Sequence, residues 1–152
     1  MAELIYFTPT SLDGYFADEN GNLDWSAPEG IPGRTPAMLD FTRIWQAADK
    51  IVYSKSRDTV STPKTRLERE FHPQVVRELK AQSPFDISVA GPTLAAHAIR
   101  AGLVDEYRLL VVSTMLGRGT RVLPSNIHIR LDLLDERRFA NGMVYLRYHP
   151  RA

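Results

Sequence analysis

The sequence of 152 residues contains no cysteine, which excludes a disulfide framework and any site built on a thiolate. It has no apolar run long enough to cross a bilayer. Its first residues, Met-Ala-Glu-Leu-Ile-Tyr, carry an acid where a secretory leader would carry a basic residue. A formal net charge of only +1 gives no support for a nucleic-acid partner. These absences predict a soluble cytoplasmic protein with neither a membrane nor a nucleic acid as partner.

Sequence motifs that would identify a type of reaction are also missing. The sequence has no P-loop and no G-x-S-x-G nucleophile elbow. The four histidines are far apart in the sequence, at His72, His97, His128 and His149. None of them forms an H-E-x-x-H spacing, so no metal site is expected. Asp105 and Glu106 are open to two interpretations. They are an acid–base pair or, more economically, solvated charges between a helix and a strand.

The length suits one domain over residues 1–152, and its centre has the pattern of a βαβ unit. The apolar run Ile87–Ala90 ends at Gly91 and Pro92. A helical segment follows and stops at Gly102, and a second apolar run covers Tyr107–Val112. Strand, turn, helix and strand in this order indicate a parallel pair of strands joined by a crossover helix.

The start of this helix is a candidate anion site. Pro92 suits the first helical turn, because an N–H at that position would have no partner in the helix. Gly91 has no side chain, so a ligand can approach the backbone closely. The free N–H groups at a helix start favour an anion such as a phosphate. The alternative is that Gly91 and Pro92 only make a tight turn, since one glycine is weaker than a full G-x-G-x-x-G fingerprint.

A buried first strand is predicted over Leu4–Thr8, and we expect Pro9 to end it. The loop that follows contains Asn20-Gly21, a strong signal for a tight turn. Bulky and acidic side chains share this loop, namely Tyr15, Leu23 and Trp25 with Asp13 and Asp24. Such a loop at the end of a strand is either a ligand wall or a surface turn held by aromatic packing.

A second candidate anion site follows the short strand predicted over Lys50–Ser54. The next residues, Lys55-Ser56-Arg57, add two cations and a hydroxyl to the hydroxyl of Ser54. Such a group can hold a phosphate through charge-assisted hydrogen bonds. On spacing alone, a solvated basic turn explains these residues as well.

The remaining pattern completes an α/β fold. Helices are predicted over 35–48 and 72–82, and strands over 65–70 and 127–133, the last ending at residue 133 or extending to residue 139. In the helix over 72–82, Val75, Val76 and Leu79 are expected to face inward. Asn141-Gly142 predicts a hairpin turn, with a returning strand over 143–148. We therefore expect a mainly parallel sheet with helices on both faces and a C-terminal antiparallel hairpin.

Five motifs occur along the chain in a characteristic order. They are Ser11-Leu12-Asp13-Gly14-Tyr15, Asp24-Trp25, Val89-Ala90-Gly91-Pro92-Thr93-Leu94, Ala101-Gly102-Leu103-Val104-Asp105-Glu106 and Leu116-Gly117-Arg118-Gly119. With this ordered set the chain resembles the C-terminal reductase domain of bacterial bifunctional riboflavin-biosynthesis deaminase–reductases, in a stand-alone form. The resemblance spans nearly the whole chain and implies a dihydrofolate reductase-like fold.

The resemblance also implies a function. It suggests a homodimeric, NADPH-dependent reductase that transfers a hydride to a small heterocyclic substrate, like the 5-amino-6-(5-phosphoribosylamino)uracil reductase of riboflavin biosynthesis. By position in the family, the cofactor diphosphate would bind at Gly91, Pro92, Thr93 and Leu94. The residues near the adenosine 2′-phosphate would be Ser54, Lys55 and Arg57. The nicotinamide and substrate cleft would be lined by Asp13, the implied catalytic residue, and Gly14, opposite Gly117 and Gly119.

The chain departs from the family pattern before Lys50. Family members have there a helix, a strand ending in Gly-Arg and a Tyr-Glu helix start, whereas this sequence has a loop over 26–36 before its helix. We interpret Gly33-Arg34 as a coincidental likeness, because no apolar strand precedes it and Pro36 follows. The shortened half suggests an alternative function, a catalytically silent relative that serves as a dimeric binding or scaffold protein.

Smaller departures lie near the implied site. Ala90 stands where a glycine is usual, so the backbone would approach a phosphate less closely. Ser113 replaces a usual proline, and Arg118 lies inside the glycine loop.

Overall fold

The computed structural model describes residues 2–26, 43–44, 46–57, 59–60 and 64–152. The chain divides into two compact units, Met1–Ala27 with Pro73–Ala152, and Pro28–His72. Most of the helix predicted over 35–48, together with Gly33 and Arg34, lies outside the described residues. Within the described part, no helix is long and apolar enough to cross a membrane.

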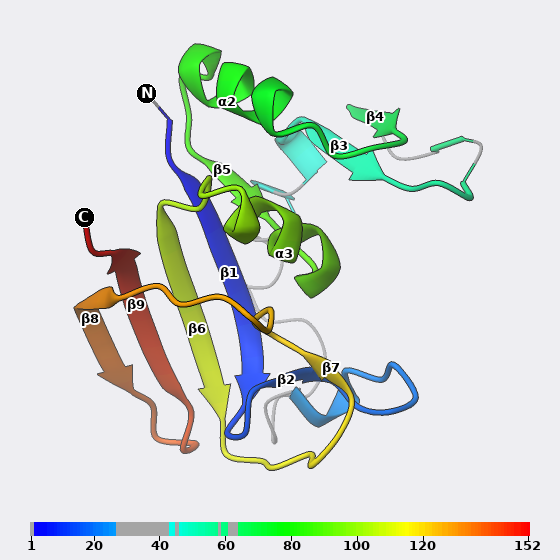
Figure 1. Cartoon of the computed structure of the whole chain (residues 1–152). Coiled ribbons are helices and arrows are strands. Elements are labelled where there is room, and N and C mark those ends of the chain that lie inside the picture. The colour runs from blue at the N-terminus through cyan, green and yellow to red at the C-terminus, as the bar shows by residue number, and fades with distance from the viewer. Residues whose placement is uncertain (1, 27–42, 45, 58, 61–63) are drawn as a thin grey trace. The chain divides into compact units, whose positions relative to one another are not determined.

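The first unit is built on a five-stranded sheet in the order β5-β1-β6-β9-β8 (Figure 1). Strand β1 (Leu4–Ser11) pairs in parallel with β5 (Ile87–Val89) on one side and with β6 (Glu106–Val112) on the other. The predicted parallel pair is therefore present, and the first strand of the chain lies between its two members. The buried side chains of Tyr6 and Thr8 contribute to the core around this strand.

Strand β1 continues past Pro9, so the expectation that this proline ends the strand is wrong. Along β1, the carbonyl of Glu3 accepts from Ile87 on the β5 side, whereas that of Leu4 accepts from Asp105 on the β6 side. Because the backbone groups alternate in direction, Pro9 faces the side of β5. Strand β5 ends at Val89, opposite Tyr6, so no ladder bond of β5 is lost at the proline.

The C-terminal hairpin is confirmed, with β8 (Leu131–Arg138) and β9 (Val144–Pro150) in antiparallel pairing. At its turn, Ser113 Oγ donates to the carbonyl of Gly142 at 2.7 Å, a bond that a proline at position 113 could not make. The prediction of a strand from residue 127 is wrong for 127–130. Leu131 pairs with Pro150, the last residue of β9, so the preceding residues have no strand beside them in the ladder.

The helices of the first unit are α2 (Pro73–Gln82) and α3 (Pro92–Arg100). The predicted stop at Gly102 is confirmed, with φ at +70°. Gly102 N–H donates to the carbonyl of Ile99, and Leu103 N–H donates to that of Ala98, both at 3.0 Å. This pair of bonds is a Schellman motif, which uses the last carbonyls of the helix and buries Leu103 against it.

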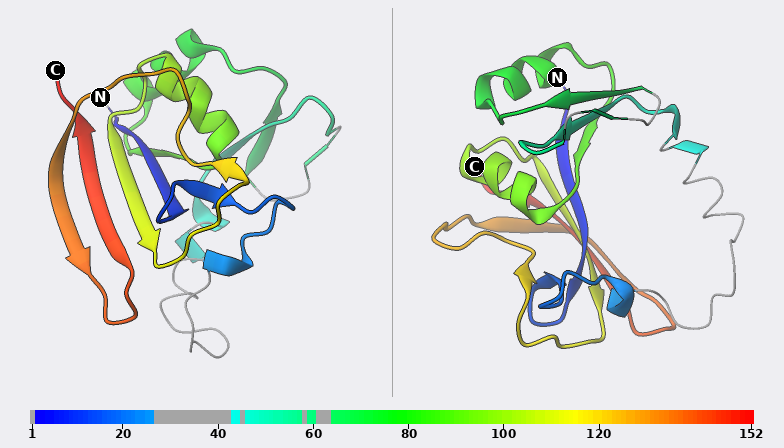
Figure 2. Two further views of the ribbon diagram at one scale, coloured as in Figure 1. Left: turned by 60° about the horizontal axis from the view of Figure 1, so that its bottom comes forward. Right: turned by 90° about the vertical axis from the view of Figure 1, so that its right-hand side faces the viewer.

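Helix α3 covers the face of the sheet that carries Tyr6. Ala95, Ala98 and Ile99 of this helix are buried. The Tyr6 hydroxyl donates to the carbonyl of Val122 at 2.8 Å, and burial raises the pKa of this phenol to about 12. The right-hand view of Figure 2 shows α3 and the chain that follows β7 on the same side of the sheet.

The buried face of α2 differs from the prediction. Val76 is buried as expected, but Val75 is 46 % exposed and Lys80 is buried instead. Lys80 Nζ donates to the carbonyl of Leu103 at 2.8 Å and lies 2.6 Å from Asp105 Oδ2. The ammonium group therefore has partners from the connection between α3 and β6, which is why it can be buried.

The solvated-charge interpretation is also wrong for Glu106, which is 2 % exposed. Arg108 Nε donates to its Oε2 at 2.6 Å, and Arg147 Nε of β9 donates to its Oε1. Two guanidinium groups thus compensate the buried carboxylate and join β6 to β9. These contacts do not support an acid–base pair of Asp105 and Glu106, because Asp105 binds Lys80 whereas Glu106 binds Arg108.

The second unit contains a two-stranded parallel sheet of β3 (Lys50–Tyr53) and β4 (Thr65–Glu68). Both strands were predicted, although β4 ends two residues earlier than the expected 65–70. The rings of Tyr53 and Phe71 lie 6.0 Å apart between centroids, which closes the carboxyl end of the pair with an aromatic contact.

Candidate functional site

Two loops at the carboxyl ends of β1 and β6 are joined backbone to backbone. Leu12 N–H donates to the carbonyl of Thr114 at 2.8 Å, and Val122 N–H donates to that of Gly14 at 2.9 Å. Between these bonds, β2 (Tyr15–Ala17) pairs antiparallel with β7 (Thr120–Arg121). The loop of Asp13 and Gly14 and the glycine loop therefore lie directly against each other, whereas the role of these residues in lining a nicotinamide and substrate cleft stays a prediction.

Asp13 is the centre of this junction. Its Oδ1 accepts from Ser11 Oγ at 2.6 Å and from Leu116 N–H at 3.1 Å, and its Oδ2 accepts from Gly117 N–H at 2.8 Å. The bond from Ser11, with those from the two amides, lowers the pKa of Asp13 to about 2. The carboxylate is thus ionised at neutral pH and acts as an acceptor for the glycine loop, not as a proton donor.

Gly119 is required by close packing within the same junction. Its φ is +132°, and a Cβ placed on it would lie 2.0 Å from the carbonyl oxygen of Ala17. No L-residue side chain fits there without moving β2. By contrast, a Cβ on Gly117 would meet no atom within 4 Å, although its φ of +77° also favours glycine. Nearby, Arg118 Nη1 lies 3.1 Å from Glu19 Oε2 on the surface.

The start of α3 has the open form that an anion site needs. Gly91 has φ +89° and ψ +129°, and no side chain caps the helix. The amides of Thr93 and Leu94 precede the first helical bond, from Ala95 N–H to the carbonyl of Gly91 at 3.0 Å. A Cβ on Gly91 would meet no atom of the described residues within 4 Å, so this part of the chain leaves space beside the turn. Free amides at a helix start are a form that suits an anion such as a phosphate.

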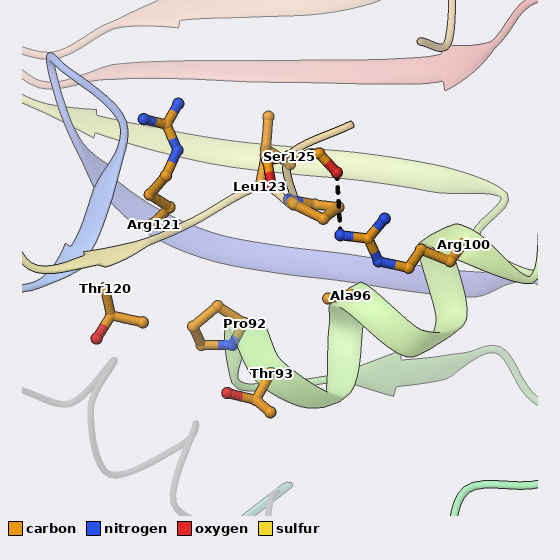
Figure 3. Close-up of a pocket in the computed structure, with 9 residues that line it drawn as sticks. Pro92, Thr93, Ala96, Arg100, Thr120, Arg121, Leu123 and Ser125 are labelled. Carbon is orange, nitrogen blue, oxygen red and sulfur yellow. Dashed lines mark hydrogen bonds between the residues drawn. The ribbon is translucent and has the colours of Figure 1, made fainter. Parts of the chain in front are cut away.

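A shallow pocket of 230 Å³ adjoins the same helical turn (Figure 3). Its lining comes from one face of α3 and from the chain after the glycine loop, namely Pro92, Thr93, Ala96, Arg100, Thr120, Arg121, Leu123, Pro124 and Ser125. Arg100 Nη2 donates to the carbonyl of Ser125 at 3.0 Å, and the Arg121 guanidinium lies 5.9 Å from the ring centroid of Tyr15. Sequence reasoning missed both arginines. The spacing of Pro92, Ala96 and Arg100 along the helix would have placed Arg100 on this face of α3.

The basic turn of the second unit is ordered by its own hydrogen bonds. Ser54 N–H donates to the carbonyl of Glu68 at 3.0 Å, and Arg57 N–H donates to Ser54 Oγ at 3.1 Å. The side chains of Lys55 and Arg57 are exposed. A further cation, Arg69, donates to backbone carbonyls of this turn. The prediction placed Ser54, Lys55 and Arg57 together but did not include Arg69, which is distant in sequence.

Of the predicted aromatic wall, Tyr15 lies in β2 and Trp25 lies in the short 3₁₀ helix η1 (Asp24–Ser26). The Trp25 Nε1–H is buried without a hydrogen-bond partner. Across the described part of the chain, no group of three or more His, Asp or Glu side chains is placed to hold a metal ion.

With this geometry in place, the chain can be compared with known proteins. Residues 71–145, which include α2, α3 and the glycine loop, match the RibD C-terminal domain. Among curated proteins, the chain is similar to the uncharacterized protein YyaP of Bacillus subtilis (strain 168), with 24% identity over 91% of this chain and 90% of YyaP.

Solved structures confirm the fold. A protein assigned to riboflavin biosynthesis from Shewanella sp. PV-4 is 20% identical, with a TM-score of 0.76 and full coverage of both chains. Dihydrofolate reductase from Enterococcus faecalis, in complex with NADP(H) and RAB-propyl, is 10% identical, with a TM-score of 0.61 over 99% of this chain and 97% of that one. The predicted dihydrofolate reductase-like α/β fold is therefore confirmed, and the RibD C-terminal domain segment lies within a reductase-type fold.

Proposed function

We propose that this chain is an NADPH-dependent reductase that transfers a hydride to a small heterocyclic substrate, related to the reductase step of riboflavin biosynthesis. The observation that carries the proposal is the start of α3 at Gly91, which has no side-chain cap and has space beside Gly91 among the described residues, within a segment that matches the RibD C-terminal domain. A helix start of this form suits the diphosphate of a dinucleotide.

We assign separate roles in the binding of NADPH to three groups of residues. The turn of Gly91 and Pro92 with the amides of Thr93 and Leu94 would hold the diphosphate. The turn of Ser54, Lys55 and Arg57 would hold the 2′-phosphate through charge-assisted hydrogen bonds. Gly14 and Gly117 would leave backbone surface open to the nicotinamide and substrate, and Gly119 would hold the glycine loop against β2 beside them. When bound, NADPH supplies the hydride, and the protein orients the rings and excludes water.

The catalytic role of Asp13 stays a prediction, and its contacts support a particular form of it. Three donors from Ser11, Leu116 and Gly117 occupy the carboxylate, and its pKa of about 2 does not suit a proton donor at neutral pH. We therefore propose that Asp13 positions the glycine loop beside the reacting rings. The homodimer and the cytoplasmic location are part of the same proposal.

Thermal unfolding in the presence of NADPH tests the proposal. A ligand that binds only the folded state adds about 2.7 kcal/mol of stability at one hundred times its dissociation constant. We expect a concentration-dependent rise in Tm with NADPH, and oxidation of NADPH when a pteridine- or pyrimidine-like ring is added. A chain that shows no rise at any NADPH concentration and forms a tight dimer by light scattering would instead be the catalytically silent relative.

A further inference from the structure

The basic turn that follows β3 is closed by a side chain from the end of β4. Arg69 Nη1 donates to the carbonyl oxygen of Ser54 at 3.2 Å and also to that of Arg57. One guanidinium group therefore bridges the first and last residues of the turn. Because the plane of a guanidinium fixes the directions of its N–H groups, this bridge sets the shape of the turn as well as adding a charge.

The parallel pairing of the two strands brings this arginine to the turn. Tyr53 is in register with Glu68, and Ser54 N–H donates to the carbonyl of Glu68 at 3.0 Å. Arg69 is the next residue, so it leaves β4 at the same edge where Ser54 leaves β3. The two segments are 15 residues apart in sequence, which is why the sequence pattern of 54–57 alone does not reveal this partner.

Cations gather on the turn. Lys55, Arg57 and Arg69 place three of them there, all on exposed residues. The two acids described at and after the end of β4 each lie near another cation. Glu68 Oε1 lies 3.6 Å from Arg66 Nε, and Glu70 Oε2 lies 3.7 Å from His72 Nε2. An excess of cations on an ordered turn favours a doubly charged phosphate monoester.

We propose that Arg69 is a positioning and specificity-determining residue, which shapes the Ser54–Arg57 turn for a ribose phosphate and thereby sets a preference for NADPH over NADH. This rests on the proposed reductase function. NADH lacks the 2′-phosphate, so it gains nothing from the turn. Loss of the guanidinium therefore weakens the binding of NADPH while leaving the binding of NADH unchanged. A role in folding alone would affect the two cofactors equally.

The test compares three variants of the full chain with the wild type. Arg69→Gln removes the charge and the bridge, and Arg69→Lys keeps the charge but not the planar fork. Arg138→Gln is the matched control, because it makes the same change of charge on an exposed arginine of β8. Dissociation constants are measured for NADPH and NADH. They are also measured for adenosine 2′,5′-bisphosphate and adenosine 5′-monophosphate, which need no reductase activity.

Because a charge-assisted hydrogen bond is lost, we expect Arg69→Gln to raise the dissociation constants of NADPH and the bisphosphate about tenfold or more. The dissociation constants of NADH and the monophosphate should change by less than about twofold. Arg69→Lys should lose part of this preference, and Arg138→Gln none. Equal weakening of both members of each pair overturns the inference, as does a wild type with no preference for the bisphosphate. A wild type that prefers the bisphosphate but neither binds nor oxidises NADPH would contradict only the proposed function.

Discussion

Asp13 shows how one side chain can set the form of a loop that is remote in sequence. Its two oxygens accept from a hydroxyl and from two consecutive amides, those of Leu116 and Gly117. A neutral side chain cannot reproduce this arrangement, because the amide group of an asparagine would place a donor against a donor. The charge of Asp13 is therefore part of the architecture of the glycine loop.

At low pH we expect this loop to loosen as Asp13 takes up a proton. The folded pKa of about 2 lies below the value near 3.9 of an unfolded aspartate. The stabilisation by this group is thus fully present above about pH 4 and is lost as the pH falls through about 2. The amide proton shift of Gly117 should titrate with a midpoint near 2.

An Asp13→Asn variant is the companion measurement. It should lower the Tm at pH 7 and lose the part of the acid dependence that belongs to this carboxylate. If the variant matches the wild type in Tm and in the Gly117 shift, the hydrogen bonds of Asp13 do not hold the loop.

At the scale of elements, the junction of β2 and β7 depends on a glycine that contacts backbone. The Cβ of any other residue at Gly119 would overlap the carbonyl of Ala17. That carbonyl is backbone, so it cannot move aside as a flexible side chain would. The pairing of Ala17 with Thr120 would have to shift instead.

Gly119→Ala and Gly117→Ala form a matched pair of variants in one loop. Gly117 has free space and only a positive φ, so alanine there should cost about 1 kcal/mol. Gly119 adds a backbone overlap, so its replacement should cost at least about 3 kcal/mol. Urea unfolding measures both. Equal losses in the two variants would contradict the packing of Gly119 against β2.

The secondary-structure elements also show how much of the fold can be predicted from the sequence. The strands of the five-stranded sheet, β3 and β4, the stop of α3 at Gly102 and the hairpin at Asn141-Gly142 follow from patterns within a few residues and were predicted, whereas the short strands β2 and β7 were not. The buried charges of Lys80 and Glu106 were not, because their compensating partners come from other elements. The partner Arg147 is 41 positions from Glu106 and becomes a neighbour only through the register of β6 and β9.

The residues of the candidate site also divide into those that local patterns predict and those that they do not. The turn at Gly91, the cleft loop and the residues at 54–57 could be proposed from local motifs and from resemblance. Arg69, Arg100 and Arg121 were missed, since each enters through pairing or through packing of a helix face. The patterns that failed, such as the alternation over 127–130, lacked a strand to pair with.

At the scale of the first unit, one ion pair links the N-terminal residues to two segments from the middle of the sequence. Lys80 of α2 meets Asp105, and Asp105 Oδ2 also accepts from Leu4 N–H at 2.8 Å. The backbone carbonyl of Lys80 in turn accepts from Ala2 N–H at 3.0 Å. This one lysine thus connects α2, the start of β1 and the connection into β6.

Removing this buried cation should destabilise the unit as a whole. We expect Lys80→Met to cost about 2 kcal/mol or more, because it leaves Asp105 and the carbonyl of Leu103 without their partner. Glu78→Gln, on an exposed residue of the same helix, is the control and should change little. Thermal unfolding measures both.

A double-mutant cycle with Asp105→Asn separates the pair from the rest of the network. The loss in Lys80→Met/Asp105→Asn should be smaller than the sum of the single losses, since the second change removes the carboxylate that the first leaves uncompensated. Additive losses would show that the two charges do not stabilise each other.

The proline within β1 also limits how copies of this protein can associate. On the side where β5 has ended, Pro9 offers an incoming strand no amide proton. Recruitment of a foreign strand along this stretch of β1 would lose a hydrogen bond, which disfavours edge-to-edge aggregation there. We therefore expect a homodimer of this chain to use side chains or another strand edge.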